Sequence, residues 1–251
     1  MKYNTADAVL IKKEEIADGI FDFVLECGEL AKISQAGQFI HIAVPSKTLR
    51  RPISICDVDG DTLRIVFQVK GEGTKILSQS KVGDTINILA PLGHGFTVNP
   101  DKKTAFIGGG IGVPPMLYSA KQCNNAVAVL GFRNKNAVIL EDDFKAVCKE
   151  VYVTTDDGSY GIHGFTSDVL KNIIDGIDEV CACGPMPMLK VIAQICKEHN
   201  KPCQVSLEER MGCGIGACLV CACKTYDKDG NMEHSHVCKK GPVYNAQEVV
   251  W

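Results

Sequence analysis

The sequence predicts an antiparallel β-barrel, then a doubly wound parallel α/β domain, then a small C-terminal domain rich in cysteine. Short apolar or alternating runs separated by turn residues fill residues 1–98, and after Pro100 the rhythm changes to strand and then helix. From Pro202 onward glycines and cysteines dominate and little periodicity remains. We therefore expect three domains, at residues 1–98, 99–202 and 203–251.

The first domain contains six runs that are typical of strands. Such short runs between turn residues favour antiparallel strands that close into a small barrel. The segment GTKILSQSKVGD interrupts them with a short helical pattern, in which Ile76 and Leu77 are apolar and Gly83 is a stop signal. The runs are DAVLIKK, GIFDFVLEC, GQFIHIAVP, RPISICDV, TLRIVFQVKG and DTINILAP.

In the second domain apolar runs alternate with segments that can be helical. The runs TAFIGGG, NAVAVLGF, EVYVTTDDG and EVCACGP each precede such a segment, for example PPMLYSAKQC. In the long segment PMPMLKVIAQICKEHN, Met188, Ile192 and Ile195 recur at three- and four-residue spacing. This alternation indicates a parallel sheet with helices on both faces.

The third domain has little apolar surface to bury, and small cores of that kind usually need a metal or a disulfide to fold.

Charge and hydropathy exclude other classes of protein. The chain has 251 residues with 27 basic and 30 acidic side chains, so it has no basic field to hold nucleic acid or anionic lipid. No run approaches the roughly 18 apolar residues of a membrane span. The N-terminal stretch alternates and carries charge, unlike a secretory signal. We expect a cytoplasmic protein with no nucleic-acid partner and no membrane association.

Thirteen cysteines, an odd number, in a chain without an export signal indicate metal binding or redox chemistry. Cys213, Cys218 and Cys221 have the spacing C-x4-C-x2-C, and Cys238 follows, which is the plant-type pattern for a [2Fe–2S] cluster. Glycines between them leave room for a loop that wraps a cluster. A structural zinc site and a set of buried thiols are the alternatives, but the x4 gap and the distant Cys238 fit zinc poorly. Strand alternation turns Cys223 away from Cys221, so we expect a packed thiol there.

Residues 108–115 form a glycine-rich run that follows the strand TAFI and opens a helix. Glycines there allow a tight turn and close backbone approach, and leave the helix N-terminus facing a phosphate. The run does not match the G-x-G-x-x-G fingerprint, and a turn that is tight only for packing is the alternative. The candidate dinucleotide-binding residues are Gly109, Gly110 and Gly112.

A second turn, Cys183-Gly184-Pro185, ends the apolar strand EVCAC and begins the longest helix. This places Cys183 at the carboxyl edge of the sheet, where open α/β sheets bind ligands. A protonated thiol is small and uncharged, so Cys183 could lie against a nicotinamide ring. A buried cysteine at a strand end is the alternative.

The turn RPIS lies between two barrel strands. Arg51 could form a bidentate hydrogen bond with a diphosphate, and Ser54 could hydrogen-bond a flavin ring nitrogen. The turn Gly71-Glu72-Gly73-Thr74 begins the short helix and offers further N–H groups for phosphate. The alternative is that these basic residues simply face solvent.

Taken in order, the motifs RPIS, GEGT, GGGIGVPP, TDDGSYG, CGPMPM and LEERMGCGIGAC closely resemble the electron-transfer subunit of NAD-dependent (class B) dihydroorotate dehydrogenase, within the ferredoxin reductase superfamily. The resemblance spans essentially the whole chain. It implies an FAD-binding barrel, an NAD-binding domain and a [2Fe–2S] domain. Ile53 stands where the superfamily often has an aromatic ring, and Trp251 is not expected to cover the flavin. The FAD-binding residues that it implies are Arg51, Pro52, Ile53, Ser54, Val66, Phe67, Gln68, Gly73 and Thr74.

The resemblance also implies a partner subunit that holds FMN and oxidises dihydroorotate to orotate, a step of pyrimidine biosynthesis, in a heterotetramer of two plus two subunits. This chain would pass the electrons through the cluster to FAD and then a hydride to NAD+, without an acid–base residue of its own. The alternatives are a reductase subunit of a hydrogenase, a sulfide dehydrogenase or a bifurcating transhydrogenase, and a binding module that holds zinc.

Overall fold

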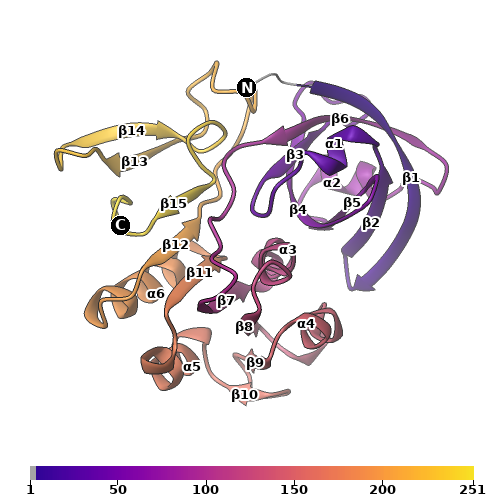
Figure 1. Cartoon of the computed structure of the whole chain (residues 1–251). Helices are drawn as coiled ribbons and strands as arrows, with labels where there is room; N and C mark the ends of the chain where they lie inside the picture. Colours follow the sequence, from indigo (N-terminus) through magenta and orange to yellow (C-terminus); the bar gives the residue numbers. More distant parts are fainter. Residues whose placement is uncertain (1–3) are drawn as a thin grey trace.

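The computed structural model describes residues 4–251 and contains a closed barrel, a seven-stranded sheet and a two-stranded sheet (Figure 1). In Figure 1 the barrel lies at the upper right, the larger sheet and its helices lie below it, and the two-stranded sheet lies at the left. This arrangement confirms the predicted fold class.

The barrel has six antiparallel strands in the order β1-β2-β5-β4-β3-β6. Its inward side chains form a core that includes Phe23 and Phe67, whose ring centroids lie 5.0 Å apart. Closure pairs every strand on both sides, so the barrel has no open edge. The short helix predicted after the fifth run is α2. The elements are β1 (Asn4–Ala17), β2 (Ile20–Glu26), α1 (Glu29–Lys32), β3 (Phe39–Ile42), β4 (Arg51–Asp59), β5 (Thr62–Gln68), α2 (Glu72–Leu77) and β6 (Thr85–Leu92).

The seven-stranded sheet has the order β10-β9-β8-β7-β11-β12-β15, parallel except for the last strand. Helices α3 and α4 cover one face, and α5 and α6 cover the other (Figure 1). The strand order reverses between β7 and β11, and ligands of such sheets bind at this switch point. The elements are β7 (Lys103–Gly109), η1 (Gly110–Gly112), α3 (Pro114–Ala120), β8 (Asn125–Phe132), η2 (Lys135–Ala137), α4 (Glu141–Val147), β9 (Glu150–Thr155), β10 (Ile162–His163), α5 (Thr166–Ile173), η3 (Ile174–Gly176), β11 (Glu179–Cys183), α6 (Met186–Glu198), β12 (Cys203–Ser206) and β15 (Val243–Asn245).

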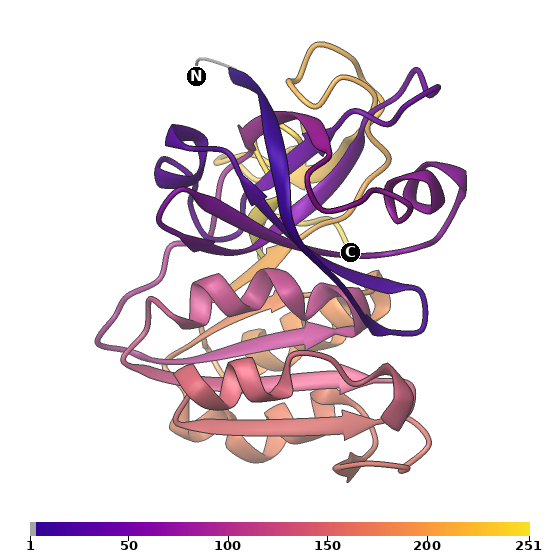
Figure 2. The same ribbon diagram turned by 90° about the vertical axis from the view of Figure 1, so that its right-hand side faces the viewer.

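The C-terminal part enters and leaves through the large sheet. β12 pairs with β11, and β15 returns to pair with β12, so the predicted division at residue 203 does not coincide with the edge of the sheet. The run CQVS is too short and too polar to be recognised as a buried strand. Between these strands the chain forms the two-stranded sheet of β13 (Ala222–Tyr226) and β14 (Met232–His236). In the turned view of Figure 2 this part lies behind the barrel.

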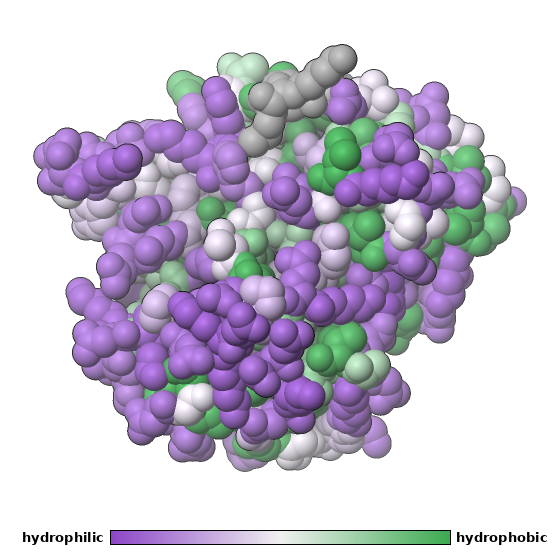
Figure 3. Space-filling view, viewed as in Figure 1, coloured by the Kyte–Doolittle hydropathy of each residue, from purple (hydrophilic) through white to green (hydrophobic). Residues whose placement is uncertain are grey.

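Hydrophilic residues cover most of the face seen in Figure 3, and hydrophobic residues lie there in small groups. This surface agrees with the nearly balanced charge of the chain, 27 basic against 30 acidic side chains. Among the helices of residues 4–251, none is long and apolar enough to cross a membrane.

Candidate functional site

A cavity of about 240 Å³ lies between the barrel and the segment that follows β12. Seven of the nine residues that the family resemblance implies for FAD line it. They come from β4 and β5, which pair in an antiparallel ladder, and from α2, which follows β5 in the chain. The seven are Pro52, Ile53, Ser54, Val66, Phe67, Gln68 and Thr74.

The remaining wall consists of residues that the sequence did not indicate. Some belong to β3 and the turn after β5, one belongs to η1, and the largest group lies between β12 and the cysteine-rich loop. The rule that ligands lie beyond the carboxyl ends of parallel strands is the signal that could have found this last group, once β12 was recognised. The added residues are Phe39, Lys70, Ile111, Ser206, Leu207, Glu208, Glu209, Met211 and Pro242.

The other two residues predicted for FAD, Arg51 and Gly73, contact each other beside the cavity. A Cβ built on Gly73 would lie 2.3 Å from Nε of Arg51, so only glycine lets the guanidinium reach the start of α2. Arg51 Nη1 donates to the carbonyl oxygens of Leu49 at 2.6 Å and Arg50 at 3.2 Å. This places a guanidinium, the side chain suited to fork onto a diphosphate, next to the GEGT turn.

The glycine run and the CGP turn meet at the switch point. β7 ends at Gly109 and β11 ends at Cys183, and the two strands are neighbours. A Cβ on Gly112 would lie 2.4 Å from the carbonyl oxygen of Cys183, and one on Gly109 would lie 3.1 Å from Cδ of Pro185. A Cβ on Gly184 would lie 3.1 Å from the nitrogen of Gly109. Glycine is therefore required on both sides of this contact, which leaves two backbones close together at the sheet edge.

The thiol of Cys183 lies at the same edge and is 2% exposed. Burial, followed by the charge of Glu208, raises its pKa to about 12, and a hydrogen bond with Ser206 lowers it slightly. The thiol therefore stays protonated and uncharged at neutral pH. Ser206 and Glu208 also line the flavin cavity, so Cys183 lies next to that cavity's wall.

The four predicted cluster ligands come together in the loop before β13 and the turn after β14. Backbone N–H groups of Ile215, Ala217 and Cys218 donate to the sulfur of Cys213 at 3.2 to 3.4 Å. The N–H of Gly216 donates to the sulfur of Cys238 at 3.1 Å. Burial raises the pKa of Cys213, but the N–H groups outweigh it and bring the pKa to about 6. The loop thus stabilises the thiolate of Cys213, the form of cysteine that binds metal, whereas burial and then the neighbouring Cys221 raise the pKa of Cys238 to about 12.

The grouping of these thiols suits two metal ions better than one. Cys221 and Cys238 have sulfurs 3.3 Å apart, and Cys213 forms a side-chain hydrogen bond with Cys218. Within residues 4–251, no three His, Cys, Asp or Glu side chains converge as a site for a single metal ion. Two pairs of cysteines suit a [2Fe–2S] cluster, in which four cysteines are shared by two irons.

The cluster loop also packs against a barrel histidine that the sequence did not single out. His41 of β3 is fully buried, and a Cβ on Gly214 would lie 2.6 Å from its Nδ1. Gly214 has φ of +73°, which favours glycine in any case. Burial, followed by the charge of Arg50, lowers the pKa of His41 to about 4. The loop is therefore seated on the flavin-binding barrel.

The other cysteines and Trp251 lie elsewhere. All thirteen cysteines are free. The thiol of Cys223 lies 3.7 Å from the hydroxyl of Tyr244. Trp251 donates from its indole nitrogen to the carbonyl oxygen of Ala246 at 2.9 Å and packs against the core of the large sheet. Neither residue lines the flavin cavity.

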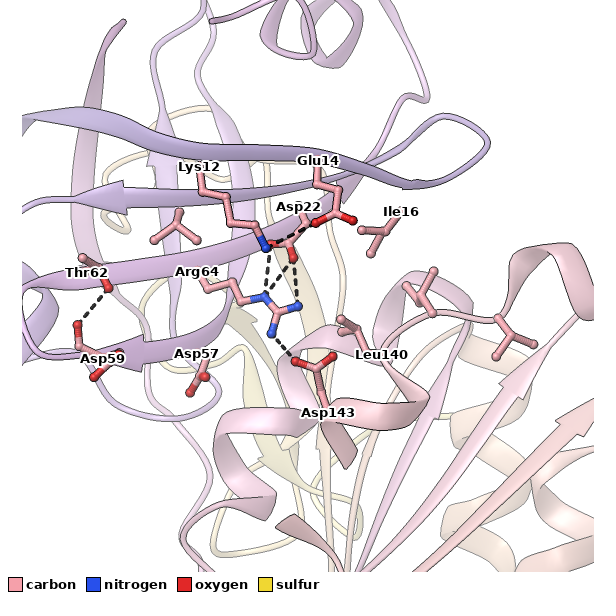
Figure 4. A pocket seen from close by; sticks show the side chains of 13 residues that line it. Lys12, Glu14, Ile16, Asp22, Asp57, Asp59, Thr62, Arg64, Leu140 and Asp143 are labelled. Atoms are coloured by element: carbon pink, nitrogen blue, oxygen red, sulfur yellow. Dashed lines mark hydrogen bonds and ion pairs between the residues drawn. The ribbon is translucent and has the colours of Figure 1, made fainter. Parts of the chain in front are cut away.

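A larger cavity, of about 560 Å³, lies where the barrel meets α4 (Figure 4). It contains none of the predicted cofactor residues. Arg64 of β5 donates to Asp22 of β2 at 2.8 to 3.1 Å and also to Asp143 of α4. Lys121, just after α3, binds Asp57 of β4. These ion pairs join the barrel to the helices of the large sheet, so we interpret this region as an interdomain contact.

Comparisons with known proteins show the family of the C-terminal part and of the whole chain. Residues 208–250 match the family model of the iron-sulfur cluster binding domain of dihydroorotate dehydrogenase B. The chain is 44% identical over 256 residues to the electron transfer subunit of dihydroorotate dehydrogenase B (NAD(+)) from Streptococcus thermophilus, covering 97% of this chain and 98% of that protein. It is 40% identical over 245 residues to the same subunit from Caldanaerobacter subterraneus, with coverage of 97% and 98%.

Solved structures show the same architecture. An NADH-dependent reduced ferredoxin-NADP oxidoreductase, studied for flavin-based electron bifurcation, superposes with a TM-score of 0.88 at 31% identity, covering 99% of this chain and 91% of that chain. A ferredoxin NADP+ reductase from Neisseria gonorrhoeae shares the fold, with a TM-score of 0.67 at 18% identity and coverage of 78% and 92%. The near full-length identity to the curated relatives decides the family: this chain is a member of the electron transfer subunits of dihydroorotate dehydrogenase B (NAD(+)).

Proposed function

We propose that this chain carries electrons from an FMN-containing dihydroorotate dehydrogenase subunit to NAD+, in the oxidation of dihydroorotate to orotate. The observation that carries this proposal is that three sites share one cavity wall. Met211, two residues before the ligand Cys213, lines the flavin cavity, and so does Ile111 of the glycine run. A flavin in this cavity contacts both the segment leading to the cluster and the turn proposed for the dinucleotide.

The cofactors supply the redox chemistry: the cluster carries single electrons, and FAD combines them into the hydride that NAD+ accepts. The chain binds and orients them. We assign the flavin ring to the pocket of Ser54, Val66 and Gln68, and the diphosphate to Arg51 beside Gly73. The RPIS segment and the GEGT turn, both barrel segments, thereby hold the ring and the diphosphate of one ligand.

We assign the dinucleotide to the switch point, with Gly109, Gly110 and Gly112 on one side and Cys183, Gly184 and Pro185 on the other. The uncharged thiol of Cys183 provides a small surface for a nicotinamide ring without attracting a counter-charge. We assign the cluster to Cys213, Cys218, Cys221 and Cys238. The three ligands correspond to an FAD domain at 1–98, an NAD domain at 99–202 and a cluster domain at 203–251, with β12 and β15 of the last domain built into the NAD-domain sheet.

We further propose assembly with the FMN subunit as two plus two, and a cytoplasmic location. The names of the relatives support a catalytic partner, since they are electron transfer subunits of a dehydrogenase. The thirteen free cysteines support a reducing compartment.

Co-purification tests the proposal. The chain, expressed in its host with an affinity tag, should be brown, contain FAD, iron and acid-labile sulfide, and bring down a partner with FMN. The complex should reduce NAD+ with dihydroorotate, and the chain alone should oxidise NADH with an artificial acceptor but not use dihydroorotate. A colourless zinc-containing protein would overturn the proposal.

The 31% identical bifurcating oxidoreductase favours a second candidate, a reductase subunit of another NAD(P)H-linked complex. The higher identity to the dihydroorotate dehydrogenase subunits, 44% over nearly the whole chain, favours the first. A partner without FMN and without dihydroorotate activity would reverse this preference.

A further inference from the structure

His41 lies between the flavin-binding strands and the cluster loop. It belongs to β3, where its register partner is Pro52 of the RPIS turn, and Phe39 of the same strand lines the flavin cavity. Arg50 Nη1 donates to the carbonyl oxygen of His41 at 3.0 Å, which fixes the backbone of the strand at this point. The imidazole therefore projects from a rigid wall of the flavin site.

On its other side the ring contacts the loop that carries the cluster ligands. A Cβ on Gly214 would lie 2.6 Å from Nδ1 and 3.2 Å from Cε1, so the loop backbone rests directly on the ring edge. Gly214 follows Cys213, and the next residues supply the N–H groups that bind the sulfurs of Cys213 and Cys238. The position of the His41 ring therefore affects the position of the proposed cluster ligand Cys213.

The ring is fully buried, and within the described part of the chain neither Nδ1 nor Nε2 has a hydrogen bond of good geometry, although backbone groups of Arg50 and Cys213 lie close enough to raise the pKa of the ring. A buried polar group without a partner is unfavourable, and in native proteins it usually marks a site where something else binds. A neutral imidazole always carries one N–H donor. The residue before Gly214, whose backbone lies at the ring, is Cys213, one of the four proposed cluster ligands.

We propose that His41 is a positioning residue for the cluster, which seats the Cys213–Cys218 loop against the flavin-binding barrel and donates a hydrogen bond to the loaded loop. The inference rests on the proposed function, since it requires a bound cluster. Hydrogen bonds toward the sulfurs raise the potential of a cluster, because they stabilise its more negative, reduced state. By seating the loop whose N–H groups donate to the sulfurs of Cys213 and Cys238, His41 tunes the electron-transfer step and fixes the position of the cluster relative to the flavin.

The test compares His41→Leu, which keeps the bulk of the ring and removes its nitrogens, with His41→Asn, which keeps a polar group near the position of Nδ1. Each is measured in the holoenzyme by redox titration followed by electron paramagnetic resonance. We expect His41→Leu to shift the midpoint potential of the cluster to a more negative value and to change its g values, and His41→Asn to restore part of the shift. The FAD content should stay unchanged. A His41→Leu protein with the potential and spectrum of the wild type overturns the proposal.

A second pair of variants tests the contact between Gly214 and His41 if His41→Leu does not fold or does not bind iron. Gly214→Ala forces a Cβ against the ring, whereas Gly216→Ala, at a similar φ of +78°, meets Cδ of Lys239 at 2.7 Å and not the ring. Both should lower the iron content, but adding His41→Ala should return iron to Gly214→Ala alone. Equal behaviour of the two double variants overturns the proposed contact. A wild-type chain that holds no iron would instead show that the proposed function itself is wrong.

Discussion

Replacement of Gly112 with alanine tests whether the turn at the switch point positions the dinucleotide. A Cβ there would lie 2.4 Å from the carbonyl oxygen of Cys183, 2.6 Å from its carbonyl carbon and 2.7 Å from Cα of Gly184. All three are backbone atoms, so no side-chain rotation relieves the overlap. Ordinary van der Waals contact begins at 3.4 Å, so η1 and the end of β11 must separate by about 1 Å.

Overpacking of this kind costs about 1–3 kcal/mol. In a chain of this size each kcal/mol lowers the unfolding midpoint by roughly 2–4 °C, so we expect a fall of roughly 2–12 °C. The two segments that separate carry the residues proposed for the nicotinamide dinucleotide. We therefore expect NADH to bind at least about tenfold more weakly, a loss of about 1.4 kcal/mol. Iron per chain should not change, because none of the four proposed cluster ligands lies in η1 or at the end of β11.

Calorimetric unfolding gives the midpoint, and titration with NADH gives the dissociation constant. The matched control is Gly176→Ala, at the end of η3, where a Cβ meets nothing within 4 Å. That variant should behave as the wild type in both measurements. If Gly112→Ala binds NADH no more weakly than Gly176→Ala does, the dinucleotide does not lie at the switch point and the reasoning fails.

Further outcomes follow from the other sites. Arg51→Ala should leave the barrel folded but lower the FAD retained after gel filtration, because the guanidinium beside α2 is lost; full flavin content would contradict this role. Cys218→Ser should lose iron and its visible absorption and make the cluster loop sensitive to protease, since that part has little core of its own; an unchanged visible spectrum would refute it. Asp143→Asn should weaken the contact of Arg64 with α4 and lower the free energy of unfolding by about 1 kcal/mol, which urea unfolding measures. The FAD content should not change. The control is Asp142→Asn, because the side chain of Asp142 is almost fully exposed. The pKa of Cys183 is raised from 9.0 to about 12 by burial, so the unfolded chain releases this proton first and the free energy of unfolding should fall above about pH 9. Urea unfolding at pH 7.5 and 10 measures this, and the decrease should be smaller by about 1 kcal/mol in Cys183→Ala than in the wild type; an equal decrease would contradict the assignment.

Much of the fold could be predicted because its signals are local. All six barrel runs became strands, and the four runs of the second domain became β7, β8, β9 and β11. The strand CQVS was missed because four residues, two of them polar, are too few to give a strand signal by themselves. β15 was missed because its pairing with β12 joins residues about forty positions apart, and no local pattern records such a contact.

The candidate sites divide in the same way. The cysteine spacing and the glycine turns are short motifs whose chemistry can be read from residue type. Residues 207–211 belong to the motif LEERMGCGIGAC, but nothing in it assigned them to the wall of the flavin cavity, and the buried His41 carried no signal. The sequence pattern around a histidine in a strand is the same whether its side chain faces solvent or a ligand loop. The role of His41 depends on which segment packs against its side chain in the folded protein.

The sequence by itself determined the local chemistry of this protein: which thiols can share a cluster, where glycine lets backbones approach, and where strands and helices begin. Only the tertiary structure decided that RPIS and GEGT meet through Arg51 and Gly73, that Gly112 faces Cys183, and that the cluster loop rests on His41. The physical reason is the separation along the sequence over which each signal acts. Propensity, alternation and motif spacing act within a few residues, whereas a cofactor site is made by side chains and backbones that become neighbours only when the barrel closes and the parallel sheet orders its strands.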